Sequence, residues 1–258
     1  MRYVMKIAYD GTEYAGWQRQ KNALSVQEVL EDALERALHI GVRVVASGRT
    51  DAGVHAVGQV CHFDSDALTI PPERLPDCLN CFLPRDVRVV EGWGADVNFD
   101  SNRSAKRKTY CYSLYVSQRD MPIKERFSVR VDDAPSLTAL QSTAKWLEGE
   151  HDYKAFCASG SAVKTTVRTV YEVKVEESES FGSRDIKIYV TGNGFLYNMV
   201  RTMTGELLDL ASGRRTQESL LRAFETGDRG LLGKTMPAKG LLLLNVNYDT
   251  KNKEEYKH

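Results

Sequence analysis

The nonapeptide GRTDAGVHA (48–56) places an aspartate, an arginine and a histidine in a segment with glycines at its start and in its middle. Apolar runs typical of strands flank it at 42–47 and 57–63, so we predict a loop that joins two strands. Glycine permits positive φ and the close approach of another molecule's backbone. Since a plain turn needs neither the acid nor the arginine, this composition indicates chemistry at Asp51.

Asp51 is compatible with several roles. An aspartate with its ordinary pKa of about 3.9 is ionised at neutral pH. Arg49, or an arginine that reaches the loop from elsewhere in the fold, would stabilise that charge. An ionised carboxylate can act as a nucleophile, a base or a metal ligand. The structural alternative is an Asx-turn, in which the side chain accepts a hydrogen bond from its own backbone. The residues alone leave these roles open.

A metal site is the least favoured of these interpretations. His55 follows Asp51 by four residues, but a glycine-containing loop does not put the two side chains on one helical face. His62 lies in a strand-like run and is expected to be a half-buried histidine with its hydrogen bonds satisfied. Cys78 and Cys81 form a CxxC pair, but a closed zinc site needs four ligands and no second pair follows. We therefore expect no metal.

A basic stretch followed by aromatic residues lies in the middle of the chain. SNRSAKRKTY (101–110) contains no acid, and Tyr110 and Tyr112 alternate along the strand-like run that follows. Basic side chains that hold phosphates, beside an aromatic ring that stacks on a base, are the ingredients of RNA binding. A solvated loop and a cross-strand aromatic pair are the structural alternatives. The basic residues of the stretch are Arg103, Lys106, Arg107 and Lys108.

Three further arginines stand out in the second half. Arg201 lies beside an apolar stripe in the helix-like run FLYNMVRTMTGELL. Such an arginine either extends its charged end to water or meets a buried anion, and Asp51 would supply one. Arg214 and Arg215 form a second basic cluster, for which a solvated loop is the plain interpretation.

The composition is that of an ordinary globular protein of one large or two small domains, with 258 residues, 42% hydrophobic and 27% charged. The 35 basic and 35 acidic residues argue against attraction of nucleic acid by the whole surface, but local patches remain possible. No segment resembles a signal peptide, and the longest aliphatic run, 241–244, is too short to span a bilayer. We expect a cytoplasmic protein with no membrane partner and with reduced cysteines.

The periodicities predict a mixed sequence of strands and helices. Ser25 begins a helix that continues with an apolar stripe to about residue 38. The helix predicted from about residue 195 is expected to end at Gly213, a glycine just past its last turn. The other predicted elements are strands at 3–9, 42–46, 57–63, 87–93, 108–116, 167–176, 186–191 and 241–248, and helices within 71–82, at 136–148, from 195 to Gly213 and at 217–226.

This order predicts an α+β fold built from two tandem ferredoxin-like β-α-β-β-α-β halves. We expect the halves at 1–103 and 104–250, with a basic linker at 98–107 and a charged tail at 251–258. The two halves are expected to form one continuous, mainly antiparallel sheet with the helices on one face. A cleft where the halves meet is the expected ligand site.

At this point the sequence resembles a known family. GRTDAGVHA, with Gln59 and Phe63 after it, is similar to the signature of the TruA family of tRNA pseudouridine synthases. The resemblance covers nearly the whole chain, and it implies a pseudouridine synthase fold around a basic cleft. Its supporting segments are YDGTEYAGWQRQ (9–20), SAKRKTYCY (104–112), GNGFLYNMVR (192–201) and PAKGLLL (237–243).

The resemblance also implies roles for individual residues. Asp51 would be the carboxylate that attacks the target uridine, and Arg201 would pair with it. Tyr110 would stack on the uracil, and Arg49 would fill the space that the extruded base leaves. No cofactor or metal is implied.

The resemblance further implies a substrate and an assembly. Family members act on uridines at tRNA positions 38, 39 and 40 and work as homodimers that share one tRNA. This chain departs from the family pattern at Ser101 and Asn102 and within 157–170, which concerns the grip on tRNA. The competing functions are an RNA-binding module without catalysis and a metal-dependent hydrolase that uses Asp51 and His55.

Overall fold

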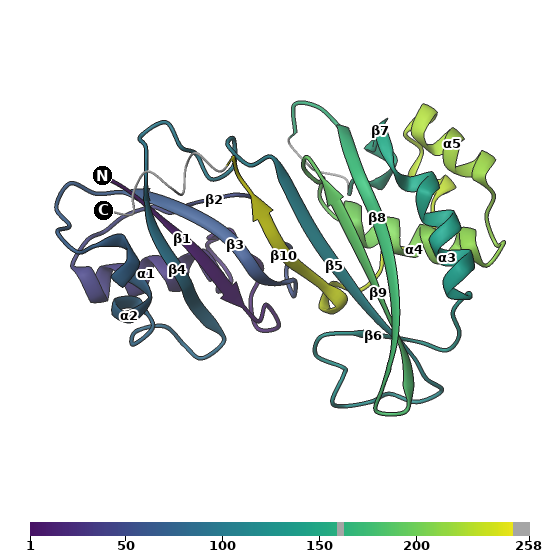
Figure 1. Cartoon of the computed structure of the whole chain (residues 1–258), viewed down its shortest axis with the longest axis horizontal. Coiled ribbons are helices and arrows are strands. Elements are labelled where there is room, and N and C mark those ends of the chain that lie inside the picture. Colours follow the sequence, from purple (N-terminus) through teal and green to yellow (C-terminus); the bar gives the residue numbers. More distant parts are fainter. Residues whose placement is uncertain (159–162, 250–258) are drawn as a thin grey trace. The chain divides into compact units, whose positions relative to one another are not determined.

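The computed structural model describes residues 1–158 and 163–249, so the predicted tail at 251–258 lies outside the described residues. The chain forms two compact units (Figure 1). Unit 1 comprises Met1–Lys108 and the chain from Leu243 onward, and unit 2 comprises Thr109–Leu242. The chain therefore enters unit 2 just after the basic stretch and returns to unit 1 within its last strand.

Unit 1 is built around one central strand. β1 pairs antiparallel with β3 on one side and with β4 on the other. Five side chains of β1 are almost fully buried, namely Tyr3, Val4, Met5, Ile7 and Tyr9. The elements of unit 1 are β1 (Arg2–Tyr9), α1 (Val26–Leu38), β2 (Val45–Ala46), β3 (His55–Asp64), α2 (Leu75–Leu79), β4 (Val87–Ala95) and most of β10 (Leu241–Asn247).

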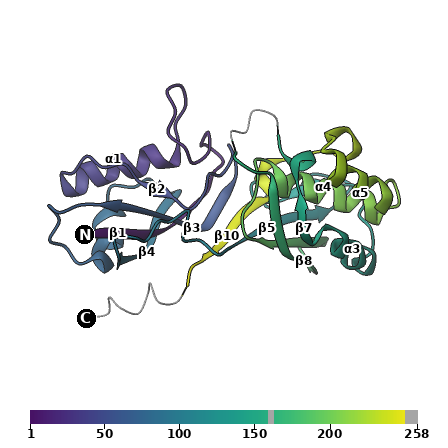
Figure 2. The same cartoon turned by 90° about the horizontal axis from the view of Figure 1, so that it is seen from above.

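The helix α1 forms as its sequence predicts. The Ser25 hydroxyl accepts a hydrogen bond from the amide of Glu28 at 3.2 Å, which satisfies one of the free amides of the first turn. Val26, Leu30 and Leu34 are buried, and the helix ends at His39, whose φ of 56° is left-handed. Figure 2 shows α1 along one face of the strands of unit 1, and α1 also packs against α2.

The strand predicted at 42–46 is wrong over most of its length, because only Val45–Ala46 pair with β3. Instead, two side chains of α1 form hydrogen bonds with the backbone of Val44. The Val44 amide donates to the Glu31 carboxylate at 3.2 Å, and its carbonyl accepts from the Gln27 amide at 3.2 Å. Helix side chains thus replace the ladder that the apolar run led us to expect.

Unit 2 contains a second set of strands. β8 pairs antiparallel with both β9 and β7, and β6 runs parallel to β5. α3 packs on β8 and against α4. The elements are β5 (Arg107–Val116), β6 (Val129–Val131), α3 (Leu137–Ala144), β7 (Gly149–Asp152), β8 (Val167–Ser180), β9 (Ser183–Gly192), α4 (Met199–Ala211) and α5 (Gln217–Thr226).

Two details of unit 2 differ from the predictions. The sequence did not reveal β6 and β7, because strands of three and four residues are too short to show an alternating pattern. α4 begins at Met199 rather than near residue 195, because Asn198 adopts a left-handed φ of 64°. The predicted end at Gly213 is confirmed, and this glycine has a φ of 73°.

The predicted fold class is confirmed, since the chain is of the mixed α+β type with a large and mostly antiparallel sheet. The predicted helix at 217–226 is also confirmed, with Thr216 as its cap. Among residues 1–158 and 163–249, no helix is both long enough and apolar enough to cross a bilayer.

Candidate active site

The loop at 47–54, which we call the catalytic loop, is braced at its start by Gln59. This side chain has no solvent exposure. Its amide nitrogen donates to the Gly48 carbonyl at 2.9 Å, and its oxygen accepts from the Ser47 hydroxyl at 2.7 Å. The Ser47 amide also donates to the Val60 carbonyl at 2.7 Å. The first turn of the loop is therefore fixed to β3.

A second segment, residues 9–17, holds the middle of the catalytic loop. The Trp17 amide donates to the Thr50 carbonyl at 3.1 Å, and the Gly53 amide donates to the Tyr14 carbonyl at 3.2 Å. The hydroxyls of Tyr9 and Thr50 form a buried hydrogen bond of 2.8 Å. Three bonds thus tie the residues on both sides of Asp51 to the end of β1 and the turn after it.

The two backbones approach so closely that two positions require glycine. A Cβ on Gly16 would lie 2.6 Å from the Thr50 carbonyl oxygen, and Gly16 has a left-handed φ of +92°. A Cβ on Gly11 would lie 2.0 Å from the Val54 carbonyl oxygen. Contacts under 3.0 Å to backbone require the chain to move, so these glycines set the conformation of the catalytic loop.

Asp51 itself is half-buried on this braced loop, between buried Thr50 and a left-handed Gly53 with a φ of 76°. The Val54 amide donates to the main-chain oxygen of Asp51 at 3.1 Å, which closes a tight turn. Arg49 is exposed, and its Nε donates to the Gln18 side chain at 3.1 Å. The loop therefore presents one carboxylate that solvent reaches in part, with a guanidinium two residues before it.

The two histidines of this region have structural partners. Nδ1 of buried His55 accepts the Gly11 amide at 3.0 Å, and the Asp10 carboxylate lies 3.1 Å from the same atom. Nδ1 of His62 bonds to the Ser101 hydroxyl at 2.8 Å, and burial lowers the pKa of His62. The prediction that His62 is a satisfied histidine is confirmed, although it is buried rather than half-buried.

The part of the chain that the structure describes contains no group of three or more histidine, cysteine, aspartate or glutamate side chains placed to hold a metal.

The basic stretch divides into one residue that contacts the catalytic loop and three that face solvent. The Lys108 ammonium donates to the Ser47 carbonyl and lies 3.2 Å from the position of a Cβ on Gly48. Lys106 is exposed and pairs with Asp249 at 3.2 Å. The other two exposed residues are Arg103 and Arg107.

Tyr110 and Arg201, the two predicted site residues of unit 2, are both ordered by packing. Tyr110 is 8% exposed and packs edge-on against Phe195, with ring centroids 5.2 Å apart. The half-buried Arg201 donates from Nε to the Met236 carbonyl at 2.7 Å and from Nη1 to the Asn198 side chain at 2.6 Å. The guanidinium of Arg201 is therefore held by hydrogen bonds to the protein, and it does not simply extend into water.

Sequence reasoning missed how the site residues are held. The contribution of Tyr9, Tyr14 and Trp17 to the catalytic loop was not recognised from their positions. The spacing of Gly11 and Gly16 around an aromatic residue was the available signal, because paired glycines indicate close backbone approach.

The α+β fold and the carboxylate on a braced glycine-containing loop agree with a pseudouridine synthase, an isomerase that converts uridine to pseudouridine. The family model described as tRNA pseudouridine synthase matches residues 5–100 and 143–249. The chain belongs to this family, whose members carry out the reaction in tRNA.

Individual relatives agree over nearly the full length. A protein of Shouchella clausii (strain KSM-K16) named tRNA pseudouridine synthase A is 42% identical over 96% of this chain and 93% of its own length. Proteins of the same name from Thermoanaerobacter sp. (strain X514) and Bacillus subtilis (strain 168) are 39% and 40% identical, each over 96% of this chain and 100% of their own length.

Proposed function

We propose that the chain converts uridines at positions 38, 39 and 40 of the tRNA anticodon stem and loop to pseudouridine, with Asp51 as the nucleophile. The observation that carries this proposal is the construction of the catalytic loop. Main-chain bonds and two obligatory glycines fix the residues on both sides of Asp51, while the carboxylate stays half-buried. A nucleophile held in this way loses little freedom when it reacts.

The reaction exchanges one glycosidic bond for another. Attack by the carboxylate, at uracil C6 or at ribose C1′, leads to cleavage of the bond between N1 and C1′. The uracil then rotates, its C5 bonds to C1′, and the bond between the carboxylate and C6 or C1′ breaks, which restores the free carboxylate. C5 loses its hydrogen as a proton and N1 gains one, so atoms and charge balance without an oxidant or a metal.

Extrusion of the uridine requires further residues. Removing a base from its stack costs about a few kcal/mol, and stacking of the uracil on Tyr110 would return about 1–3 kcal/mol. Arg49 is exposed beside the nucleophile and is proposed to occupy the vacated space. Arg201 is proposed to pair with Asp51 and keep it ionised. This assigns the nucleophile to residues 1–103 and the stacking and pairing residues to 104–250.

Affinity for tRNA is proposed to come from phosphate contacts by Arg103, Lys106, Arg107 and Lys108. Three of these side chains are exposed, as such contacts require. Lys108 also fixes the start of the catalytic loop, so phosphate binding by this residue would affect the position of the loop. We further propose that the enzyme works in the cytoplasm as a homodimer, as the resemblance to the TruA family implies. A dimer is compatible with the zero net charge of the chain, because two subunits can line one basic surface.

Release of tritium from tRNA labelled at uracil C5 tests the proposal, since forming the new bond must expel that hydrogen. We expect release with the wild-type protein and none with Asp51→Ala or Asp51→Asn, while both variants still bind tRNA. Equal release by wild type and Asp51→Ala would remove Asp51 from the mechanism. Binding of tRNA by the wild-type protein without release of tritium would favour an RNA-binding module, and loss of wild-type activity to a chelator would favour a metal-dependent hydrolase.

A further inference from the structure

The segment Asp228–Pro237, which we call the strap, lies along α4 and reaches Arg201. Its Gly233 amide donates to a carboxylate oxygen of Glu206 at 2.6 Å. One turn earlier along the helix, the hydroxyls of Thr235 and Thr202 bond at 3.0 Å. The strap is therefore attached to successive turns of the helix that carries Arg201.

The attachment ends at Arg201 itself. The Met236 amide donates to the Arg201 carbonyl at 3.2 Å, and the Met236 carbonyl accepts from Arg201 Nε at 2.7 Å. The next carbonyl, that of Pro237, accepts from the Tyr112 hydroxyl at 2.6 Å. Tyr112 lies on β5 two residues after Tyr110, so the strap connects the helix of Arg201 to the strand of Tyr110.

The strap sits directly on the helix backbone. A Cβ on Gly205 would lie 1.9 Å from the Lys234 carbonyl oxygen. A Cβ on Gly233 would lie 2.5 Å from the Asp209 carboxylate and 3.1 Å from the Gly205 carbonyl oxygen. Only a glycine at position 205 permits this approach. Because the strap packs directly against the helix, a small displacement of the strap also moves the Met236 carbonyl that holds Arg201.

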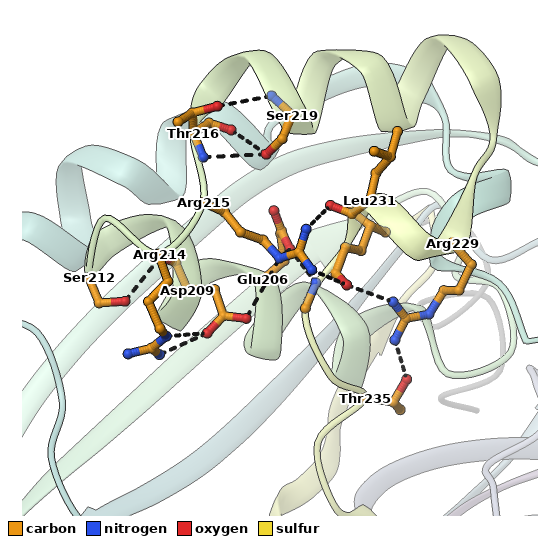
Figure 3. Close-up of polar contacts among 12 residues, drawn as sticks. Glu206, Asp209, Ser212, Arg214, Arg215, Thr216, Ser219, Arg229, Leu231 and Thr235 are labelled. Carbon is orange, nitrogen blue, oxygen red and sulfur yellow. Dashed lines mark hydrogen bonds and ion pairs between the residues drawn. The ribbon is translucent and has the colours of Figure 1, made fainter.

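Two arginines also hold the strap, Arg215 from outside it and Arg229 from within it, and Figure 3 shows both beside Leu231 and Glu206. Arg215 donates to the carbonyls of Leu231 and Leu232, and its Nε lies 3.6 Å from the Glu206 carboxylate. Arg229 donates to the Leu232 carbonyl at 3.2 Å and to the Thr235 hydroxyl at 3.0 Å. The prediction of a solvated cluster at Arg214 and Arg215 is therefore wrong for Arg215. Its side chain is 28% exposed, against 63% for that of Arg214.

Glu206 is the one fully buried charged residue in this network, with 0% exposure. Its Oε2 accepts the Gly233 amide, and within the described residues its Oε1 has no hydrogen-bond partner. Burial raises the pKa of this carboxyl, and Asp209 adds to the effect. The Gly233 amide and the nearby guanidinium groups of Arg215 and Arg229 act in the opposite direction. A buried carboxylate with one unsatisfied oxygen costs stability, so its position calls for another explanation.

We propose that Glu206 is a positioning residue for Arg201 and acts through the strap. Its carboxylate fixes Gly233, Gly233 fixes the strap, and the Met236 carbonyl then orients the guanidinium. This inference rests on the proposed role of Arg201 in catalysis. Because Glu206 has no exposed surface, it acts on the chemical step and not on the binding of tRNA.

Two substitutions at this position separate anchoring from simple packing. Glu206→Ala removes the acceptor for the Gly233 amide, whereas Glu206→Gln keeps an acceptor oxygen of the same reach. We expect hydrogen exchange at the amides of Gly233 and Met236 to become faster in Glu206→Ala and to stay close to wild type in Glu206→Gln. We expect kcat for tritium release to fall about tenfold in Glu206→Ala, with an unchanged KM for tRNA, and to be largely restored in Glu206→Gln.

A double variant tests whether the effect passes through Arg201. If it does, Glu206→Ala should add little to the loss caused by Arg201→Lys, because residues in one network are not additive. Asp185→Asn is the matched control. It removes the half-buried carboxylate that pairs with Lys124 in unit 2, away from the strap, and should leave kcat unchanged.

Each outcome bears on a separate claim. Unchanged exchange in Glu206→Ala would overturn the anchor, and faster exchange with an unchanged kcat would overturn its effect on catalysis. Effects that multiply in the double variant would show that Glu206 does not act through Arg201. If Arg201→Lys alone kept the full rate, the role of Arg201 in the proposed function would fail and this inference with it. Tritium release by Asp51→Ala would instead contradict the proposed role of Asp51 as nucleophile, while the hydrogen-exchange result at Gly233 and Met236 would remain valid.

Discussion

The catalytic loop of unit 1 and the strap of unit 2 are both irregular segments fixed in place, and both use main-chain hydrogen bonds and close backbone contacts. They differ in the use of acidic side chains. The neutral side chains of Gln59 and Tyr9 support the catalytic loop, and its charged residues Arg49 and Asp51 remain at least partly accessible. In the strap, a fully buried acid, Glu206, accepts a main-chain amide.

This difference follows from what each segment must present. A loop that is proposed to present a carboxylate to RNA cannot also use that carboxylate as its own support, so backbone groups, glycines and neutral side chains support it. The strap offers a carbonyl to Arg201, which leaves charged side chains free to fix it from within the unit. Substitution of Gly16 should therefore disturb the catalytic loop, whereas substitutions of the polar side chains around Arg201 should act through the strap and its helix.

The largest expected effect is that of Gly16→Ala. A methyl group would meet the Thr50 carbonyl at 2.6 Å while the residue is held at a left-handed φ of +92°. We expect a loss of at least about 2 kcal/mol in the free energy of unfolding. We also expect tritium release below detection, because Thr50 precedes Asp51. Thermal unfolding and the tritium assay measure the two effects.

Gly41→Ala is the matched control, since no atom lies within 4 Å of a Cβ at Gly41. It should leave both stability and activity near wild type. If Gly16→Ala were as active as Gly41→Ala, the catalytic loop would not depend on close backbone contact, and the contrast with the strap would be lost.

A smaller effect is expected from Asn198→Gly in unit 2. This change removes the side-chain oxygen that accepts from Arg201 Nη1 at 2.6 Å, and glycine tolerates the left-handed φ of 64° at this position. We expect kcat for tritium release to fall about tenfold, which corresponds to the loss of one hydrogen bond to a charged group. The apparent tRNA affinity should not change.

Asn198→Asp serves as the comparison, because it keeps an acceptor oxygen and also tolerates a left-handed backbone. Its rate should lie close to wild type. A slow Asn198→Asp together with a fast Asn198→Gly would contradict the claim that polar side chains orient Arg201.

The same contrast explains what the sequence could and could not predict. Asp51 and its glycines lie within nine residues, so one short motif contains both the reactive group and the conformational signal. Glu206 and Gly233 are 27 residues apart, and the sequence between them shows no pattern that joins them. For the same reason Arg215 was predicted to be solvated, because its partners Leu231 and Leu232 come from a distant turn.

The secondary structure follows this rule as well. α1 was predicted at its observed position because its cap, Ser25, is local. The strand at 42–46 was predicted too long because its competitors, Gln27 and Glu31, lie on a helix earlier in the chain. In these cases, a helix that neighbouring residues cap was predicted correctly, and a strand that distant side chains disrupt was not.

Tyr9→Phe should have a moderate effect on unit 1. The change removes the buried hydrogen bond of 2.8 Å to the Thr50 hydroxyl and leaves that hydroxyl without this partner. We expect a loss of about 1 kcal/mol in the free energy of unfolding and a kcat reduced by less than about tenfold. The main-chain bonds of Thr50 remain, so the catalytic loop should keep most of its order.

Tyr3→Phe on the same strand is the control for this prediction. Its hydroxyl donates to the Leu68 carbonyl at 3.1 Å, outside the catalytic loop. The two variants should lose similar stability, but only Tyr9→Phe should slow tritium release. Equal kinetics would mean that the hydroxyl of Tyr9 supports the fold of unit 1 without ordering Asp51.

The smallest effects are expected in the pH dependence of stability, and here Glu206 and Asp64 should have opposite signs. Burial raises the pKa of Glu206, so its contribution to stability is present below its unfolded pKa and is lost as pH rises through the folded value. The hydrogen bond from Arg2 lowers the pKa of the exposed Asp64, so its contribution is present above the unfolded pKa and is lost as pH falls through the folded value.

Chemical denaturation would measure this difference for Glu206→Gln between about pH 4 and pH 7, above the unfolded pKa of a glutamate, and for Asp64→Asn between about pH 2 and pH 4, below the unfolded pKa of an aspartate. Relative to wild type, Glu206→Gln should gain stability as pH rises, because glutamine does not ionise in the buried site. Asp64→Asn should lose stability relative to wild type as pH rises through its own lower interval, by a small amount because water screens an exposed ion pair. Parallel curves for both variants would mean that the strap does not hold a buried charge, and the contrast between side-chain and backbone support would then rest on geometry alone.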